Sequence, residues 1–455
     1  MNETRSIILY TWVLLFVVLL SSCHKEDIRL KWDVKKKGEQ RTLVMGDDNK
    51  VNYTAYEKVH YVSWIQDSAY QYMNIYVPHN LREENPPIFL KTYTAGYMAS
   101  KAKAPMANDA TGYALSEGYV VCVVGSRGWN STVRGVYNGR APEAILDLKA
   151  AVRYLHSNDS IMPGDANRII ASGSSAGGAL VSLLGASANH KDYDILMELT
   201  GAAEGRDDVW AVVSYSPITN LENSDMAYEW QFCSTNETRG LSERQAYLSS
   251  QLAAMFPAYM ETEGVSEEEM EQWMSNSIMS SAYRAEREGQ VIPLETGVNI
   301  ADSVVDMRQF VHYIAGVQPL KTPPAFDALN VVNNRGTFEN KIFGNMDGKD
   351  ANYTEFSMAN QLDGSKELGD DIKWKVRLMN PMNYIGSSSH LCKHWYIRYG
   401  TLDRDSSFPI VLLMEHKLKK QGVDINFALQ WGEVHNGDYK LSELFDWLSK
   451  IEDIQ

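Results

Sequence analysis

The sequence is poor in cysteine and has no arrangement of cysteine and histidine that is typical of a metal site. It holds 4 cysteines among 455 residues, with no C-x-x-C pair and no H-E-x-x-H motif. The chain has no excess of positive charge: 58 Asp and Glu residues outnumber 43 Lys and Arg residues, and the formal net charge at pH 7 is −15. A surface of this sign disfavours nucleic acid. We therefore expect no metal, no cofactor and no nucleic-acid partner.

Internal repeats and low-complexity segments are absent as well, which argues against solenoids and extended linkers. Hydrophobic residues make up 44% of the chain and charged residues 22%, a composition typical of a packed globular protein. The length suits one large α/β domain with an insertion, or two to three ordinary domains.

One long hydrophobic run is present, and it lies at the start of the chain. Residues 7–20 are almost all apolar, which is too short for a membrane span and right for a signal-peptide core. Leu20-Ser21-Ser22-Cys23 follows and resembles the lipobox of bacterial lipoproteins. We expect a signal peptide over 1–22, lipidation at Cys23 and a polar tether over 23–52. A plain membrane anchor is the alternative.

The stretch around Ser175 organises the rest of the chain. Gly173-Ser174-Ser175-Ala176-Gly177 is a G-x-S-x-G pattern between a short apolar strand at 169–171 and an apolar helix at 179–184. A serine on such a sharp turn has strained dihedral angles, so its neighbours must be small. The pattern predicts a nucleophile at Ser175, and a structural glycine turn is the alternative.

Strands and helices alternate on both sides of this turn. Apolar strand patterns occur at 86–94, 118–125, 209–215, 395–400 and 426–429, and amphipathic helices at 142–155, 409–420 and 441–451. Such alternation predicts an α/β fold with a mostly parallel sheet and helices on both faces.

The stretch from about 230 to 375 shows no buried strand run. We interpret it as a lid inserted into the α/β core. The core then has two parts, 53–230 and 376–455, with the lid at 231–375.

A serine nucleophile needs a base, and the base needs an acid that orients it. Asp403 follows the strand at 395–400, and His435 follows the strand at 426–429. The order serine, acid, histidine is the one used by α/β-hydrolases. We predict a triad of Ser175, Asp403 and His435, with Asp405 on the same loop as the alternative acid.

The oxyanion of an acyl-transfer intermediate needs two N–H donors. Ala176, the residue after the nucleophile, is the first candidate. The second lies in the loop after the strand at 86–94, where we favour Ala95 over Gly96.

These motifs together resemble the bacterial tannases (tannin acyl hydrolases), which are α/β-hydrolase esterases. The resemblance rests on the GYMASK loop, the helix APEAILDLKAAVRYL, the long lid and Asp403-Arg404-Asp405. In that family the residue two positions after the triad acid binds galloyl hydroxyls, together with a lysine and a glutamate of the lid. The resemblance assigns those roles to Asp405, Lys341 and Glu355.

The resemblance implies a serine carboxylic ester hydrolase that cleaves galloyl esters, which are small-molecule substrates. A feruloyl or acetyl esterase acting on plant polysaccharide is the nearest alternative. A peptidase of the same fold and a non-catalytic binding lipoprotein are further ones. We expect the protein to be anchored by its lipid to the bacterial outer membrane, on the periplasmic side or at the cell surface, with no other membrane contact.

Overall fold

The computed structural model describes residues 30–46, 49–329, 336–362, 364, 366–388 and 390–453. The expected signal peptide and Cys23 lie outside these residues, so the lipid anchor stays a prediction. None of the helices in the described part is both long and apolar enough to cross a membrane.

Within the described residues, nine strands form one sheet in the order β1-β2-β3-β5-β4-β8-β9-β12-β13. The strands from β5 to β13 run parallel, and β1, β2 and β3 extend the sheet in antiparallel fashion. The strands of this sheet are β1 Glu39–Val44, β2 Lys50–Val59, β3 Met73–Pro78, β4 Pro87–Thr92, β5 Val120–Val124, β8 Asp165–Ser174, β9 Ala211–Tyr215, β12 His394–Gly400 and β13 Asp424–Gln430. Two short hairpins lie apart from it: β6 Thr132–Val133 with β7 Val136–Tyr137, and β10 Val298–Asn299 with β11 Val304–Val305.

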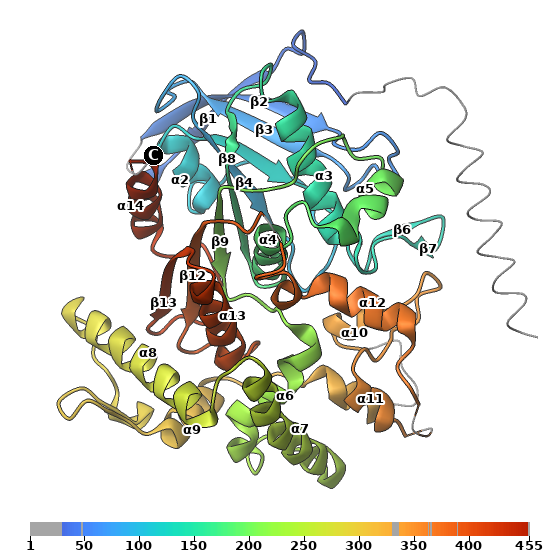
Figure 1. Cartoon of the computed structure of the whole chain (residues 1–455). Coiled ribbons are helices and arrows are strands. Elements are labelled where there is room, and N and C mark those ends of the chain that lie inside the picture. Colours follow the sequence, from blue (N-terminus) through green and yellow to red (C-terminus); the bar gives the residue numbers. More distant parts are fainter. Residues whose placement is uncertain are drawn as a thin grey trace, which may run out of the picture.

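Helices cover both faces of the sheet (Figure 1). One face packs against α3 Glu143–Asn158, α4 Ala176–Ala186 and α13 Phe408–Lys420. The other packs against α2 Ala110–Ser116 and α14 Leu441–Glu452. The central strands β4, β5 and β9 are buried along their whole length, as expected for parallel strands covered on two sides. The predicted architecture is confirmed.

The predicted tether over 23–52 is too long. Residues 39–44 form β1 and residues 50–52 begin β2, and the two strands pair antiparallel at one end of the sheet. β1 is an edge strand with mostly exposed side chains. Its sequence is therefore polar, and composition alone could not separate it from a linker.

A long segment without strands of the main sheet connects β9 to β12 in the described part of the chain. Figure 1 shows its helices below the sheet. They are α6 Leu221–Phe232, α7 Glu243–Thr262, α8 Glu267–Arg287, α9 Met307–Val317, α10 Phe338–Ile342, α11 Glu355–Ala359 and α12 Asp370–Met379; α5 Asp194–Thr200 belongs to the core instead. We call this segment the insertion. It begins before the predicted 231, because α6 already belongs to it.

Parallel strands β8, β9, β12 and β13 bring their carboxyl ends to one edge of the sheet. The loops after β8, β12 and β13 carry Ser175, Asp403 and His435. The insertion follows β9, so it also leaves from this edge. This edge is where open α/β sheets bind ligands.

A buried ion pair fixes the loop that supports the turn after β4. The Arg127 guanidinium is fully buried and contacts Asp147 on α3 through Nη2 at 2.8 Å. The backbone N–H of Arg127 also donates to Asp147. Next along the chain, the N–H of Trp129 donates to the carbonyl of Tyr97 at 3.1 Å. The ion pair thereby anchors the turn at Thr94–Tyr97 to α3.

Replacing Asp147 by alanine should lower the free energy of unfolding by about 3 kcal/mol, because it leaves a buried guanidinium without its main partner. Denaturant unfolding of the two proteins measures the change. Glu83→Ala, which removes an exposed partner of Arg168, is the control and should cost less than about 1 kcal/mol. Equal effects of the two substitutions would contradict the assigned role of the ion pair.

Candidate active site

Ser175 lies on a sharp turn between β8 and α4. Its backbone is in a conformation rare for a non-glycine residue, with φ 58° and ψ −125°. A Cβ atom on Gly173 would lie 2.4 Å from the carbonyl carbon of Gly177, so the chain can close this tightly only with glycine there. The small residues of the motif are therefore required by the geometry of the turn.

Ser175, His435 and Asp403 form a continuous hydrogen-bonded chain. The Nε2 atom of His435 lies 2.8 Å from Ser175 Oγ, and its Nδ1 atom lies 2.8 Å from Asp403 Oδ2. Asp403 is 1% exposed and also accepts the backbone N–H groups of Asp405 and Ser406. Of the two acids on this loop, the structure thus brings Asp403 to the imidazole.

The environment of His435 favours its protonated form. Burial by itself would lower the pKa of His435, but the charge and hydrogen bond of Asp403 outweigh it, and Asp405 adds to the effect. The pKa of His435 is therefore raised above its ordinary value. An imidazole that is stabilised as a cation suits a base that takes a proton during attack.

The segments that carry the two predicted oxyanion donors meet at the start of α4. Ala176 is the first residue of α4, where N–H groups point out of the helix end. The turn after β4 contacts this helix end, because the Thr94 carbonyl accepts the N–H of Gly177 at 2.9 Å. Gly96 lines the cleft at Ser175, whereas Ala95 is exposed. Ala95 stays the predicted donor and Gly96 its alternative.

Ser175 and His435 open onto a cleft between the sheet edge and the insertion. The open space measures about 920 Å³. Its lining consists of Gly96, Tyr97, Ser175, Ile218, Lys321, Thr322, Thr337, Phe338, Glu339, Asp405 and His435. The core thus contributes the triad side of the cleft, and the insertion contributes most of the opposite wall.

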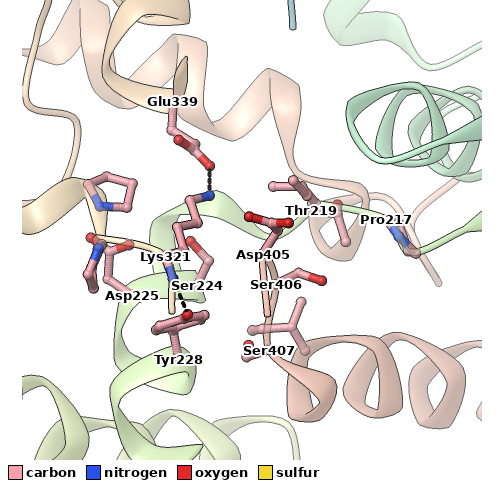
Figure 2. Close-up of a pocket in the computed structure, with 14 residues that line it drawn as sticks. Pro217, Thr219, Ser224, Asp225, Tyr228, Lys321, Glu339, Asp405, Ser406 and Ser407 are labelled. Carbon is pink, nitrogen blue, oxygen red and sulfur yellow. Dashed lines mark hydrogen bonds and ion pairs between the residues drawn. The ribbon is translucent and has the colours of Figure 1, made fainter. Parts of the chain in front are cut away.

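Three charged side chains from separate segments meet in this cleft. Figure 2 shows the Lys321 ammonium between the carboxylates of Glu339 and Asp405, and Lys321 forms an ion pair with Glu339. Burial by itself would lower the pKa of Lys321, but the neighbouring Glu339 carboxylate outweighs it and raises the pKa. Among the described residues, the Glu339 Oε2 atom finds no hydrogen-bond partner. This oxygen is buried, whereas the Lys321 and Asp405 side chains are 20% and 33% exposed and can contact a ligand in the cleft.

The structure corrects the prediction for Lys341 and Glu355. The Lys341 ammonium lies over the Trp129 ring, 4.6 Å from its centroid. Glu355 pairs with Lys373 at 2.8 Å, and its side chain is 65% exposed. Neither residue lines the cleft. Lys321 and Glu339 line the cleft together with Asp405 instead.

Sequence reasoning missed Lys321 and Glu339 because nothing local marks them. Lys321 lies in an irregular segment, and Glu339 lies in the five-residue helix α10. The two residues are 18 positions apart in the chain. This separation does not by itself predict that their side chains meet. Only the packing of the insertion decides which lysine and which glutamate meet Asp405.

A metal ion would compete with the triad geometry. Within the described part of the chain, one group of possible ligands was found: Asp403, Asp405 and His435, with ligand atoms within 4.8 Å of one another. These atoms include those that orient His435. A cation there would displace the His435–Asp403 hydrogen bond, so the residues present fit proton transfer better than metal binding.

Comparison with known proteins identifies close relatives among esterases. Residues 73–261 match a family model described as BD-FAE. The tannase of Fusobacterium nucleatum is 35% identical, with a TM-score of 0.82, over 93% of this chain and 99% of that one. A tannin acyl hydrolase solved in complex with ethyl gallate is 30% identical, with a TM-score of 0.83, over 93% and 98% of the two chains.

The tannin acyl hydrolase of Lactobacillus plantarum is 29% identical, with a TM-score of 0.82, over 92% of this chain and 98% of that one. A search of curated proteins gave no match.

Labelling of Ser175 by a fluorophosphonate should slow as the pH falls through the raised pKa of His435, because a protonated imidazole cannot accept the hydroxyl proton. Since the Asp405 charge helps to raise that pKa, Asp405→Asn should move the acidic limb to lower pH, by less than about 1 unit. Labelling rates measured from about pH 5 to pH 9 test this. If the acidic limb of the rate–pH profile stays in place or moves to higher pH in Asp405→Asn, the assigned effect of the Asp405 charge on His435 is wrong.

Proposed function

The chain belongs to the tannase family of carboxylic ester hydrolases with the α/β-hydrolase fold, and we propose that it cleaves galloyl esters through an acyl-enzyme on Ser175. The observation that carries this proposal is the shared cleft. The Ser175–His435–Asp403 chain opens into the same space as Lys321, Glu339 and Asp405. A nucleophile and a polar group that suits an acyl group thus line one cleft.

In the acylation step, Ser175 Oγ attacks the ester carbonyl and His435 Nε2 takes its proton. Asp403 holds the imidazole by its Nδ1 atom and stabilises the positive charge that forms. The N–H groups of Ala176 and Ala95 bind the oxyanion in this proposal. His435 then protonates the leaving alcohol, and the acyl group remains on Ser175.

Deacylation repeats the sequence with water. The alcohol leaves, and a water molecule takes its place beside His435, which removes a proton as the water attacks the acyl carbonyl. Collapse of the second intermediate returns the proton to Ser175 and releases the carboxylic acid. The same oxyanion donors serve both steps.

Lys321, Glu339 and Asp405 suit the ring of a trihydroxybenzoyl group. Three adjacent phenol hydroxyls are donors, and carboxylates are acceptors of charge-assisted hydrogen bonds. The ammonium of Lys321 favours a phenol oxygen that carries partial negative charge. The solved tannin acyl hydrolase complexes with ethyl gallate and 3,4-dihydroxybenzoate support a phenolic substrate of this kind here.

A feruloyl or acetyl esterase is the second candidate, favoured by the match of residues 73–261 to the BD-FAE model. A feruloyl ring has fewer hydroxyls, and an acetyl group has no ring. Lys321, Glu339 and Asp405 would then contribute little to turnover. The two candidates differ in their dependence on these three residues.

Ser175→Ala should lower the turnover of methyl gallate by about 10⁴-fold or more, because it removes the nucleophile. Gallate release by the purified protein, followed by chromatography, is the measurement. Hydrolysis rates of ferulate and acetate esters, measured in the same way, show which acyl group the enzyme prefers. Gallate release by the variant at the wild-type rate would exclude this mechanism.

Lys321→Met and Glu339→Gln should each lower kcat/KM for methyl gallate by about 10- to 100-fold, since each removes a charged partner of the ring hydroxyls. Hydrolysis of p-nitrophenyl acetate should change much less, because an acetyl group does not reach them.

Lys341→Met and Glu355→Gln are the matched controls. They make the same chemical changes in the insertion outside the cleft, and they should leave kcat/KM for both substrates close to wild type. Larger losses in the control pair than in the cleft pair would refute the assignment of the hydroxyl-binding group.

A further inference from the structure

Helix α6 supports the segment that carries Lys321. Two of its side chains, one helical turn apart, reach this segment. The Asp225 carboxylate accepts the N–H of Ala325 at 2.7 Å, and the Tyr228 hydroxyl accepts the N–H of Lys321 at 2.8 Å. Burial raises the pKa of Asp225 to about 8, so at neutral pH this acid is mostly uncharged and does not repel Glu339.

The Tyr228 hydroxyl makes a second contact, to the loop of the triad acid. It donates to the carbonyl of Arg404 at 2.7 Å, and Arg404 lies between Asp403 and Asp405 in the chain. Tyr228 is 5% exposed, and its ring packs against Phe232. One buried hydroxyl thus joins the backbone of Lys321 to the backbone beside Asp405. Figure 2 shows the contact of this hydroxyl with the Lys321 backbone.

Two further contacts join the residues just before Lys321 to this loop. The Gln318 amide donates to the carbonyl of Leu402 at 3.0 Å, and the Arg404 guanidinium contacts the carbonyl of Pro319. These contacts hold the insertion segment against the loop of the triad acid, but they do not involve Lys321, whose ammonium enters the cleft. The Tyr228 bridge acts at Lys321 itself.

We propose that Tyr228 is a positioning residue for substrate selection: by bridging Lys321 and Arg404, it sets the separation of the Lys321 and Asp405 side chains to match a ring with adjacent hydroxyls. The inference rests on the proposed function. The reaction at the ester carbonyl does not depend on it directly, because Asp403 is held by hydrogen bonds from its own loop. Tyr228 touches neither the substrate carbonyl nor the triad side chains in this role.

Tyr228→Phe removes the bridging hydroxyl and keeps the ring that packs against Phe232. We expect kcat/KM for methyl gallate to fall about tenfold, mainly through KM, because the charged partners of the ring hydroxyls lose their alignment. For p-nitrophenyl acetate we expect a clearly smaller loss. Calorimetric titration with gallate should show a matching loss of affinity.

Tyr283→Phe is the matched control. It also removes a tyrosine hydroxyl from the insertion, but this hydroxyl bonds Ser303 at 2.7 Å and Ile300 at 3.3 Å instead of the Lys321 segment and the loop of the triad acid. Its ratio of gallate to acetate hydrolysis should equal that of wild type. Thermal unfolding of both variants verifies that each one folds.

The outcomes separate this inference from the proposed function. If the wild-type enzyme shows no preference for ring-hydroxylated acyl groups, both the proposed function and the role of Tyr228 are wrong. If the wild-type enzyme has this preference and Tyr228→Phe keeps it, only the role of Tyr228 is wrong. Equal losses for both esters, or a parallel loss of fluorophosphonate labelling, would show that Tyr228 supports the triad in general and overturn its role in selection.

Discussion

The strained backbone of Ser175 is the constraint on which the rest of the active site depends. A non-glycine residue at φ 58° costs on the order of 1–3 kcal/mol, so its surroundings must hold it. The N–H of Ser175 donates to the carbonyl of Tyr215 on β9 at 2.9 Å. A Cβ atom on Gly437, near His435, would lie 2.6 Å from the Ser174 side chain. The neighbouring strand and the histidine loop therefore both pack against the turn, and their packing also aligns the triad.

The core and the insertion contribute different side chains to the cleft. The core supplies the atoms proposed for acyl transfer from loops at the ends of parallel strands, whose spacing the sheet fixes. The insertion supplies Lys321 and Glu339, charged groups that are costly to bury unless they are paired. The ion pair between them and the adjacent Asp405 lower that cost.

Much of the core could be predicted because its signals are local. The small residues around Ser175 are required by one tight turn, and the buried parallel strands are continuous apolar runs. The order of Ser175, Asp403 and His435 along the chain then follows from strand order. The polar edge strand β1 could not be recognised, because its exposed side chains resemble those of a linker.

The sequence by itself determined the fold class, the family and the three residues that the structure brings together at 2.8 Å. Each of them lies on the turn or loop that follows a strand, so short-range patterns place it at a known edge of the sheet. Tertiary structure alone decided the polar wall of the cleft, where Lys321 and Glu339 stand in place of Lys341 and Glu355. The reason is physical: the described part of the insertion adds no strand to the main sheet that would fix its register, and long-range contacts such as the Tyr228 bridge determine which of its side chains reach the cleft.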